Sequence, residues 1–269
     1  MDACRWATKS IPYAPYVTAL PWISHYGCHF VVHGDDITAD SNGEDCYRYV
    51  KAAGRFLVVS RTPGISTTDL VGRMLLCTKN HFIASLERVL AGEEGSGSEE
   101  ERKKAGQDKM KRIQDYASDE TGLQPACEVW SWLPSPSDRS ARRRSSNDRR
   151  SSLGSSKGTC RQLVAGKGPR RGQRTVYVDG GFDLFSSGHI EFLRCVAQAE
   201  QEAGAARGWY DGAASQQRIL EHGEDYPPAY LIAGIHDDDV INACKGLNYP
   251  IMNIFERGLC VLQCKVCLI

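Results

Sequence analysis

The residues best suited to chemistry stand in the stretch VDGGFDLFSSGHIEFL. An apolar run ends at the glycine pair 180–181, and a Gly188–His189 step then opens an amphipathic segment, which predicts a buried strand, a turn and a helix N-terminus. Backbone N–H groups at a helix start attract anions, because they lie at the positive end of the helix dipole. His189 could donate to a phosphoryl oxygen there, and a donor so placed is worth roughly 10²–10³ in rate.

Two cations downstream could complete such a site. Lys245 and Arg257 lie in CKGLNYPIMNIFERG, and together they could clamp a triphosphate tail. Each also has a plainer interpretation. Lys245 could be a solvated lysine, and Arg257 beside Glu256 could be a charge on a helix surface.

A second anion site is indicated in SRTPGISTTDL, in the first third of the chain. Arg61 and Gly64 precede the hydroxyls of residues 66–68, which open the helical pattern DLVGRMLL. Hydroxyl residues at this position commonly only cap a helix, but the nearby Arg and Gly favour phosphate binding.

The segment VVHGDDIT ends another apolar burst with polar side chains. Ligands of open α/β sheets bind at the carboxyl ends of strands, so His33, Asp35 and Asp36 are expected to contact substrate rather than a metal. Cys260, Cys264 and Cys267 could in principle hold zinc, but they lie in an apolar helical pattern with no second ligand pair nearby. We therefore predict no protein metal site.

The patterning predicts an α/β protein with a Rossmann-like parallel sheet, divided into three regions. Residues 1–90 and 173–269 alternate strand, loop and helix, with strands near 30–32, 56–59, 174–180 and from 230, and a last helix from about Asn253. Residues 91–172, which are charged and Ser/Arg-rich, are expected to form a disordered, solvated linker. A polar insertion, roughly 204–226, is expected to be a surface loop.

The bulk properties exclude some functions. The formal net charge is zero, so overall charge gives no argument for a nucleic-acid partner. The Ser/Arg-rich tract could bind RNA phosphates, but it lacks interleaved aromatic residues that would stack on bases. No apolar run is long enough to span a bilayer and the first residues lack a signal-peptide pattern, which predicts a cytoplasmic protein.

Four motifs in this order resemble the CTP:phosphoethanolamine cytidylyltransferases, a family of tandem-domain nucleotidyltransferases. They are VHGDDIT, RTPGISTTDLVGRML, GGFDLF-x-x-GH and CKGLNYPIMN-x-x-ER. The related phosphocholine enzymes share the RT-x-GIST motif but have a single catalytic domain, so the phosphocholine reaction is the less favoured alternative.

The resemblance implies cytidylyl transfer from CTP to phosphoethanolamine, with Mg²⁺ on the triphosphate, in phosphatidylethanolamine synthesis. It implies catalytic roles for His189, Lys245 and Arg257, and substrate contacts for His33 and Asp35. A homo-oligomer is possible. The nucleotide contacts that it implies are Arg61, Thr62, Gly64, Ile65, Ser66, Thr67, Gly181, Phe182, Asp183 and Gly188.

The chain departs from the family pattern in two ways. Ser186 stands where the motif has its first His, and a serine cannot offer a cation, so an impaired site is expected. The chain also matches the late half of the first domain and the early half of the second. These halves could dock as one composite site, with Gly188 and Ser66 within about 15 Å, the scale of one pocket. The alternative function is a non-catalytic regulatory or interaction fragment.

Overall fold

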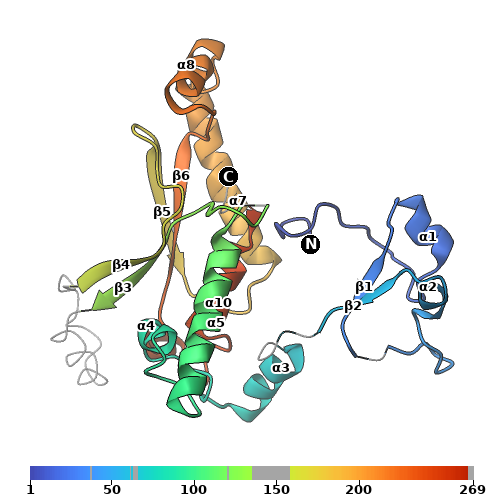
Figure 1. Ribbon diagram of the computed structural model, residues 1–269. Coiled ribbons are helices and arrows are strands. Elements are labelled where there is room, and N and C mark those ends of the chain that lie inside the picture. The colour runs from blue at the N-terminus through green and yellow to red at the C-terminus, as the bar shows by residue number, and fades with distance from the viewer. Residues whose placement is uncertain (37, 61, 63–65, 120, 135–157, 266–269) are drawn as a thin grey trace. The chain divides into compact units, whose positions relative to one another are not determined.

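The structure is a computed structural model that describes residues 1–36, 38–60, 62, 66–119, 121–134 and 158–265 (Figure 1). The chain forms two compact units, which we describe separately. The smaller unit is Lys9–Asp69, and the larger unit joins Met1–Thr8 to Leu70–Ile269. Both units contain parallel strand pairs with helices, which confirms the predicted α/β fold class.

The smaller unit is built around a short parallel pair. Strands β1 (Val31–His33) and β2 (Phe56–Val58) pair in parallel, as the apolar bursts predict. One short helix precedes each strand: α1 (Leu20–His25) comes before β1, and α2 (Arg48–Ala52) comes before β2. Helix α3 (Thr67–Leu76) begins in this unit and continues into the larger one. Among the described residues of the smaller unit, the buried apolar side chains are those of Ile23, Cys46 and Val50.

The larger unit contains a longer parallel pair that carries the Gly-His turn. Strands β5 (Arg174–Gly180) and β6 (Ala229–Ile235) pair along their whole length, and helices α7 (Ser187–Ala206) and α10 (Ile254–Leu262) pack against β6 (Figure 1). The predicted strands and the helix after Asn253 are thereby confirmed. Helix α9 (Asp238–Lys245) was not predicted. A core cluster under the turn contains Phe182, Leu193, Val261 and Cys264.

The expected linker contains regular structure, which corrects the prediction for part of residues 91–172. Helix α5 (Glu99–Ala117) begins with a capping box between Ser98 and Glu101 and packs against α4 (Leu86–Leu90) and α10. Its composition is polar, but its few small and apolar residues recur at helical spacing and are buried at Gly106, Ile113 and Ala117. Low average hydrophobicity therefore concealed an amphipathic helix.

Two further elements lie in stretches expected to be irregular. Strands β3 (Val129–Pro134) and β4 (Gly158–Val164) form an antiparallel pair, and residues 135–157 of the Ser/Arg-rich tract lie outside the described residues. The expected surface loop contains helix α8 (Gly212–His222). Contacts of Arg218 support this helix, because its side chain is buried between the Asp225 carboxylate and the Trp209 ring. The prediction of a surface loop is wrong for this part of the stretch.

Residues 73–83 are hydrogen-bonded to the third sequence region, and the larger unit includes the chain from Leu70 onward. Arg73 forms a two-point ion pair with Glu256, at 2.8 and 3.0 Å, and donates to the Ile251 carbonyl. The Ile83 N–H donates to the Asp238 carboxylate at 2.9 Å. The ion pair and these hydrogen bonds thus join residues 73–83 to residues 238–256, although composition assigns the two stretches to different regions.

The two ends of the larger unit also meet. The backbones of Cys4 and Cys264 form an isolated antiparallel β-bridge, and the Lys265 N–H donates to the Ala3 carbonyl at 2.9 Å. The predicted composite site would join Ser66 of the smaller unit to Gly188 of the larger one, and it stays a prediction. No helix among the described residues is both long and apolar enough to cross a membrane.

Candidate functional site

The turn after β5 is held in an unusual backbone shape. Phe182 and Leu184 have positive φ angles of 50° and 49°, a left-handed conformation that residues with a Cβ adopt rarely. Neither Gly180 nor Gly181 has a positive φ, so the left-handed positions of the turn belong to residues with a side chain. Gly181 instead permits close packing, because a Cβ there would lie 3.3 Å from the Ile241 side chain.

His189 caps the start of α7 with its own ring. The backbone N–H of Ser186 donates to His189 Nδ1 at 3.1 Å, so the neutral imidazole carries its proton on Nε2. The Phe185 ring stacks on the imidazole with centroids 5.5 Å apart, and the Phe182 ring lies 5.8 Å away. The ring is therefore fixed in orientation and keeps one N–H to donate.

Asp183 lies in the turn but faces the protein. Its two carboxylate oxygens accept from the backbone N–H groups of Ile251 and Met252, at 2.8 and 2.9 Å. The carboxylate thus holds the loop before α10. Its predicted contact with nucleotide stays a prediction.

Arg257 is fully buried, in contrast to the surface position that its neighbour Glu256 suggested. Its guanidinium donates to three carbonyls, those of Gly181, His236 and Met252, at 2.6, 2.7 and 2.9 Å. It also pairs with the Asp238 carboxylate at 2.7 Å. In this structure the guanidinium therefore has protein partners on several sides, and the predicted triphosphate contact stays a prediction.

Asp238 is the participant that the sequence analysis missed. It is buried, and burial raises the pKa of its carboxyl group, partly offset by the Ile83 N–H and by Arg257. The signal was present in the Asp triplet that follows β6, because Asp237 is the N-cap of α9 and leaves the next Asp at the first helical position. Nothing local reveals that this second Asp turns inward.

Lys245 is placed quite differently from Arg257. It is exposed at the end of α9, and its Nζ lies 5.7 Å from the Tyr249 ring centroid. An exposed ammonium on a flexible stem is compatible with the predicted contact to a phosphate.

The candidates of the smaller unit are only partly described. Arg61, Gly64 and Ile65 lie outside the described residues, whereas Thr62 and Ser66 lie in irregular backbone and Thr67 is the first residue of α3. His33 ends β1, with its ring 4.7 Å from that of Tyr47 and Nδ1 3.9 Å from the Asp36 carboxylate. Asp35 is exposed beside it.

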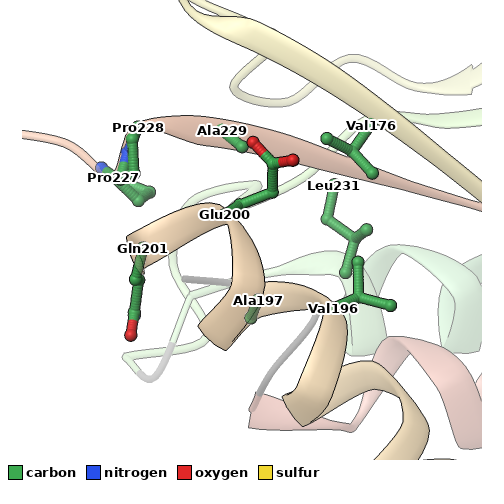
Figure 2. A pocket seen from close by; sticks show the side chains of 9 residues that line it. All are labelled: Val176, Val196, Ala197, Glu200, Gln201, Pro227, Pro228, Ala229 and Leu231. Carbon is green, nitrogen blue, oxygen red and sulfur yellow. The ribbon is translucent and has the colours of Figure 1, made fainter. Parts of the chain in front are cut away.

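A small hollow lies at the opposite ends of the strands from the Gly-His turn. Figure 2 shows it between α7 and the starts of β5 and β6, with the Glu200 carboxylate beside Val176 and Pro228. Its volume of about 30 Å³ is far below that of a ligand pocket, so it cannot hold a nucleotide. None of the predicted site residues lines it.

Comparison with known proteins agrees with the motifs. Residues 1–73 match the family model described as cytidylyltransferase-like. The ethanolamine-phosphate cytidylyltransferase of Mus musculus is 33% identical over 98% of this chain and 54% of its own length, and that of Dictyostelium discoideum is 32% identical over the same shares. The Saccharomyces cerevisiae enzyme of that name is 56% identical over 26% of this chain and 22% of its own.

The chain spans about half the length of the curated relatives it matches. The match nonetheless runs through both units and both ends of the Ser/Arg-rich tract, since it covers 98% of the chain. The resemblance predicted from four motifs is confirmed: the chain is related over nearly its whole length to the ethanolamine-phosphate cytidylyltransferases, a family of nucleotidyltransferase enzymes.

Proposed function

We propose that this chain takes part in cytidylyl transfer from CTP to phosphoethanolamine, giving CDP-ethanolamine and pyrophosphate. The observation that carries the proposal is the turn between β5 and α7, where the oriented His189 lies at a helix start after a parallel strand. The names of the relatives support the choice of ethanolamine-phosphate as the substrate. The product would enter phosphatidylethanolamine synthesis, and we place the reaction in the cytoplasm.

The reaction requires alignment and charge stabilisation. A phosphate oxygen of phosphoethanolamine attacks the α-phosphorus of CTP, and the bond from that phosphorus to the oxygen bridging toward the β-phosphate breaks. The bonding electrons leave with pyrophosphate, and no covalent enzyme intermediate is needed. His189 Nε2–H would donate to a phosphoryl oxygen as its negative charge grows. Lys245 would neutralise negative charge on the leaving pyrophosphate.

The expected Mg²⁺ is not assigned protein ligands. Within the described ranges, no group of three or more His, Cys, Asp or Glu side chains lies together as a metal site would require. We propose that the ion is carried on the triphosphate, where it would neutralise charge, and we derive no step through it.

Binding is the first test of the proposal. Titration of the protein with CTP and Mg²⁺ should show saturable binding, and His189→Ala and Arg61→Ala should each weaken it about tenfold or more, because each removes a donor to an anion. His222→Ala is a matched control, since this imidazole lies at the end of α8, away from the turn. Unchanged affinity in both His189→Ala and Arg61→Ala would show that the assigned site is wrong.

Turnover is the second test. Ser186→His should increase CDP-ethanolamine formation, because a second imidazole beside the phosphoryl group restores a donor worth roughly 2–4 kcal/mol at the transition state. A rate that stays the same or falls would contradict the role given to position 186. Wild-type protein that binds CTP without turnover would favour a regulatory fragment over an enzyme.

A further inference from the structure

Two charged side chains, those of Arg257 and Asp183, link the Gly-His turn to the loop before α10 by hydrogen bonds. We propose that Arg257 and Asp183 are positioning residues that hold the segment 181–184 in the shape that receives a phosphate, rather than contacts to the triphosphate. The inference rests on the proposed function and assigns a different kind of role within the same site.

The first argument is the burial of Arg257. Its side chain has no exposed surface, and four of its hydrogen-bond donors are directed at protein oxygens 2.6–2.9 Å away. A guanidinium has five N–H donors, so a triphosphate would have to displace protein partners to be bound by several of them. One of these partners is the Asp238 carboxylate, whose buried charge would then be left unpaired.

The second argument is the pattern of bonds between the loops. Arg257 donates to the Gly181 carbonyl in the turn and to the Met252 carbonyl in the loop before α10. Asp183 accepts from the Met252 and Ile251 N–H groups, so it ties the same two loops together in the opposite direction. The bond from Arg257 to His236 adds the loop after β6. The turn after β5 and the loop after β6 lie at the carboxyl ends of the parallel pair, where ligands of such sheets bind, and the loop before α10 is bonded to that turn.

The third argument is the backbone of the turn. Phe182 and Leu184 hold left-handed conformations that are unfavourable for residues with a Cβ. Such conformations persist only where surrounding interactions enforce them, and they cluster at functional sites. The bonds to Gly181 and Asp183 flank Phe182 on both sides, and its ring is buried in the core cluster. Without these bonds, the turn is expected to relax.

The test distinguishes a positioning role from direct contact with the triphosphate. Arg257→Lys keeps the positive charge but cannot bridge three carbonyls and a carboxylate, so a positioning role predicts at least a tenfold loss of CTP·Mg²⁺ affinity despite the conserved charge. Asp183→Asn should weaken binding likewise, although it removes a negative charge near an anion site. Arg218→Lys is the matched control, because it alters another Arg–Asp pair of the same unit in which the arginine is buried, and it should bind within twofold of wild type.

A ligand-free measurement supplies the readout that general destabilisation would not give. Amide hydrogen exchange at residues 182–185 and 251–252 should be about tenfold faster in Arg257→Lys and Asp183→Asn, while exchange in α5 stays as in wild type. If Arg257→Lys does not fold, Asp183→Asn decides by the same two measurements.

The outcomes are distinct. If wild-type protein does not bind CTP, the proposed function fails, and the exchange data alone still decide whether these residues position the turn. If Arg257→Lys binds CTP within twofold of wild type, or if exchange at the turn is unchanged in either variant, the positioning role is overturned.

Discussion

The two parallel strand pairs of this protein differ in how well their ends are supported. The pair β1–β2 has three residues in each strand, and side chains on it remain widely exposed, with Val32 at 56% and Val58 at 61%. The pair β5–β6 has seven residues in each strand and lies over a core that includes Leu193, which has no exposed surface. Both pairs end in candidate site residues.

The difference shows what a binding turn needs besides its motif. After β5, the loops are joined by buried charges, and His189 is held by a backbone N–H and a stacked ring. After β1, His33 has a ring contact with Tyr47 and a 3.9 Å approach to Asp36. A preorganised site avoids ordering costs when the ligand binds, so the β5 turn should contribute more binding free energy per contact.

The largest expected effect contrasts the core beneath β5–β6 with an exposed position on β2. Leu193→Ala should lower the free energy of unfolding of the larger unit by about 2–5 kcal/mol, because it opens a cavity in a fully buried cluster. Val58→Ala should change the stability of the smaller unit by no more than about 0.5 kcal/mol, as at other exposed positions. Urea denaturation with hydrogen exchange of each unit measures both. Equal losses would contradict the difference in support between these two positions.

A second comparison concerns ion pairs in the two units. Arg73→Met should cost about 2–3 kcal/mol, since it leaves the largely buried Glu256 carboxylate without its cation. It should also make residues 70–90 sensitive to protease. Arg48→Met removes a more exposed cation, which pairs with Asp40 and Glu44 in the smaller unit, and should have a smaller effect. The prediction fails if residues 70–90 stay protected in Arg73→Met.

Two helix glycines sharpen the contrast between packed and open surfaces. A Cβ on Gly106 in α5 would lie 2.5 Å from the Leu90 carbonyl, so Gly106→Ala should destabilise by about 1–3 kcal/mol despite the better helix propensity of alanine. A Cβ on Gly72 in α3 meets no atom within 4 Å, so Gly72→Ala should stabilise by about 0.5–1 kcal/mol. Thermal unfolding of both variants reports the two signs.

The smallest effect is a pH dependence at the α8 end of the larger unit. The hydrogen bond from Arg218, followed by that from Ser215, holds the pKa of Asp225 well below its usual range. A carboxylate with a lowered folded-state pKa contributes stability above its unfolded pKa of about 4 and loses it as pH falls toward the folded value. The protection factors of the α8 amides, which allow for the intrinsic pH dependence of amide exchange, should therefore fall below about pH 4, and Asp225→Asn should flatten that dependence. An identical profile for both proteins would refute it.

Local patterns predicted the elements whose sequences are self-sufficient. Strands β5 and β6 are alternating or continuous apolar runs, and α10 follows its N-cap Asn253, which forms a capping box with Glu256. Helices α5 and α8 were missed because their hydrophobic faces are narrow and their composition is polar. The burial of α5 also depends on partners far along the chain, since Phe255 and Leu259 lie in the same cluster as Ile113.

By itself, the sequence determined the order of the parallel strands, the glycine turn and the helix start that carries His189, because period, capping and turn chemistry are local properties. It also contained the motifs from which the relatives could be predicted. Only the tertiary structure decided that Arg257 turns inward to Gly181, that Asp238 is its buried partner, and that Phe182 adopts a left-handed backbone. These features depend on which carbonyls and carboxylates from distant segments meet one guanidinium, and that meeting is fixed only when the loops pack together.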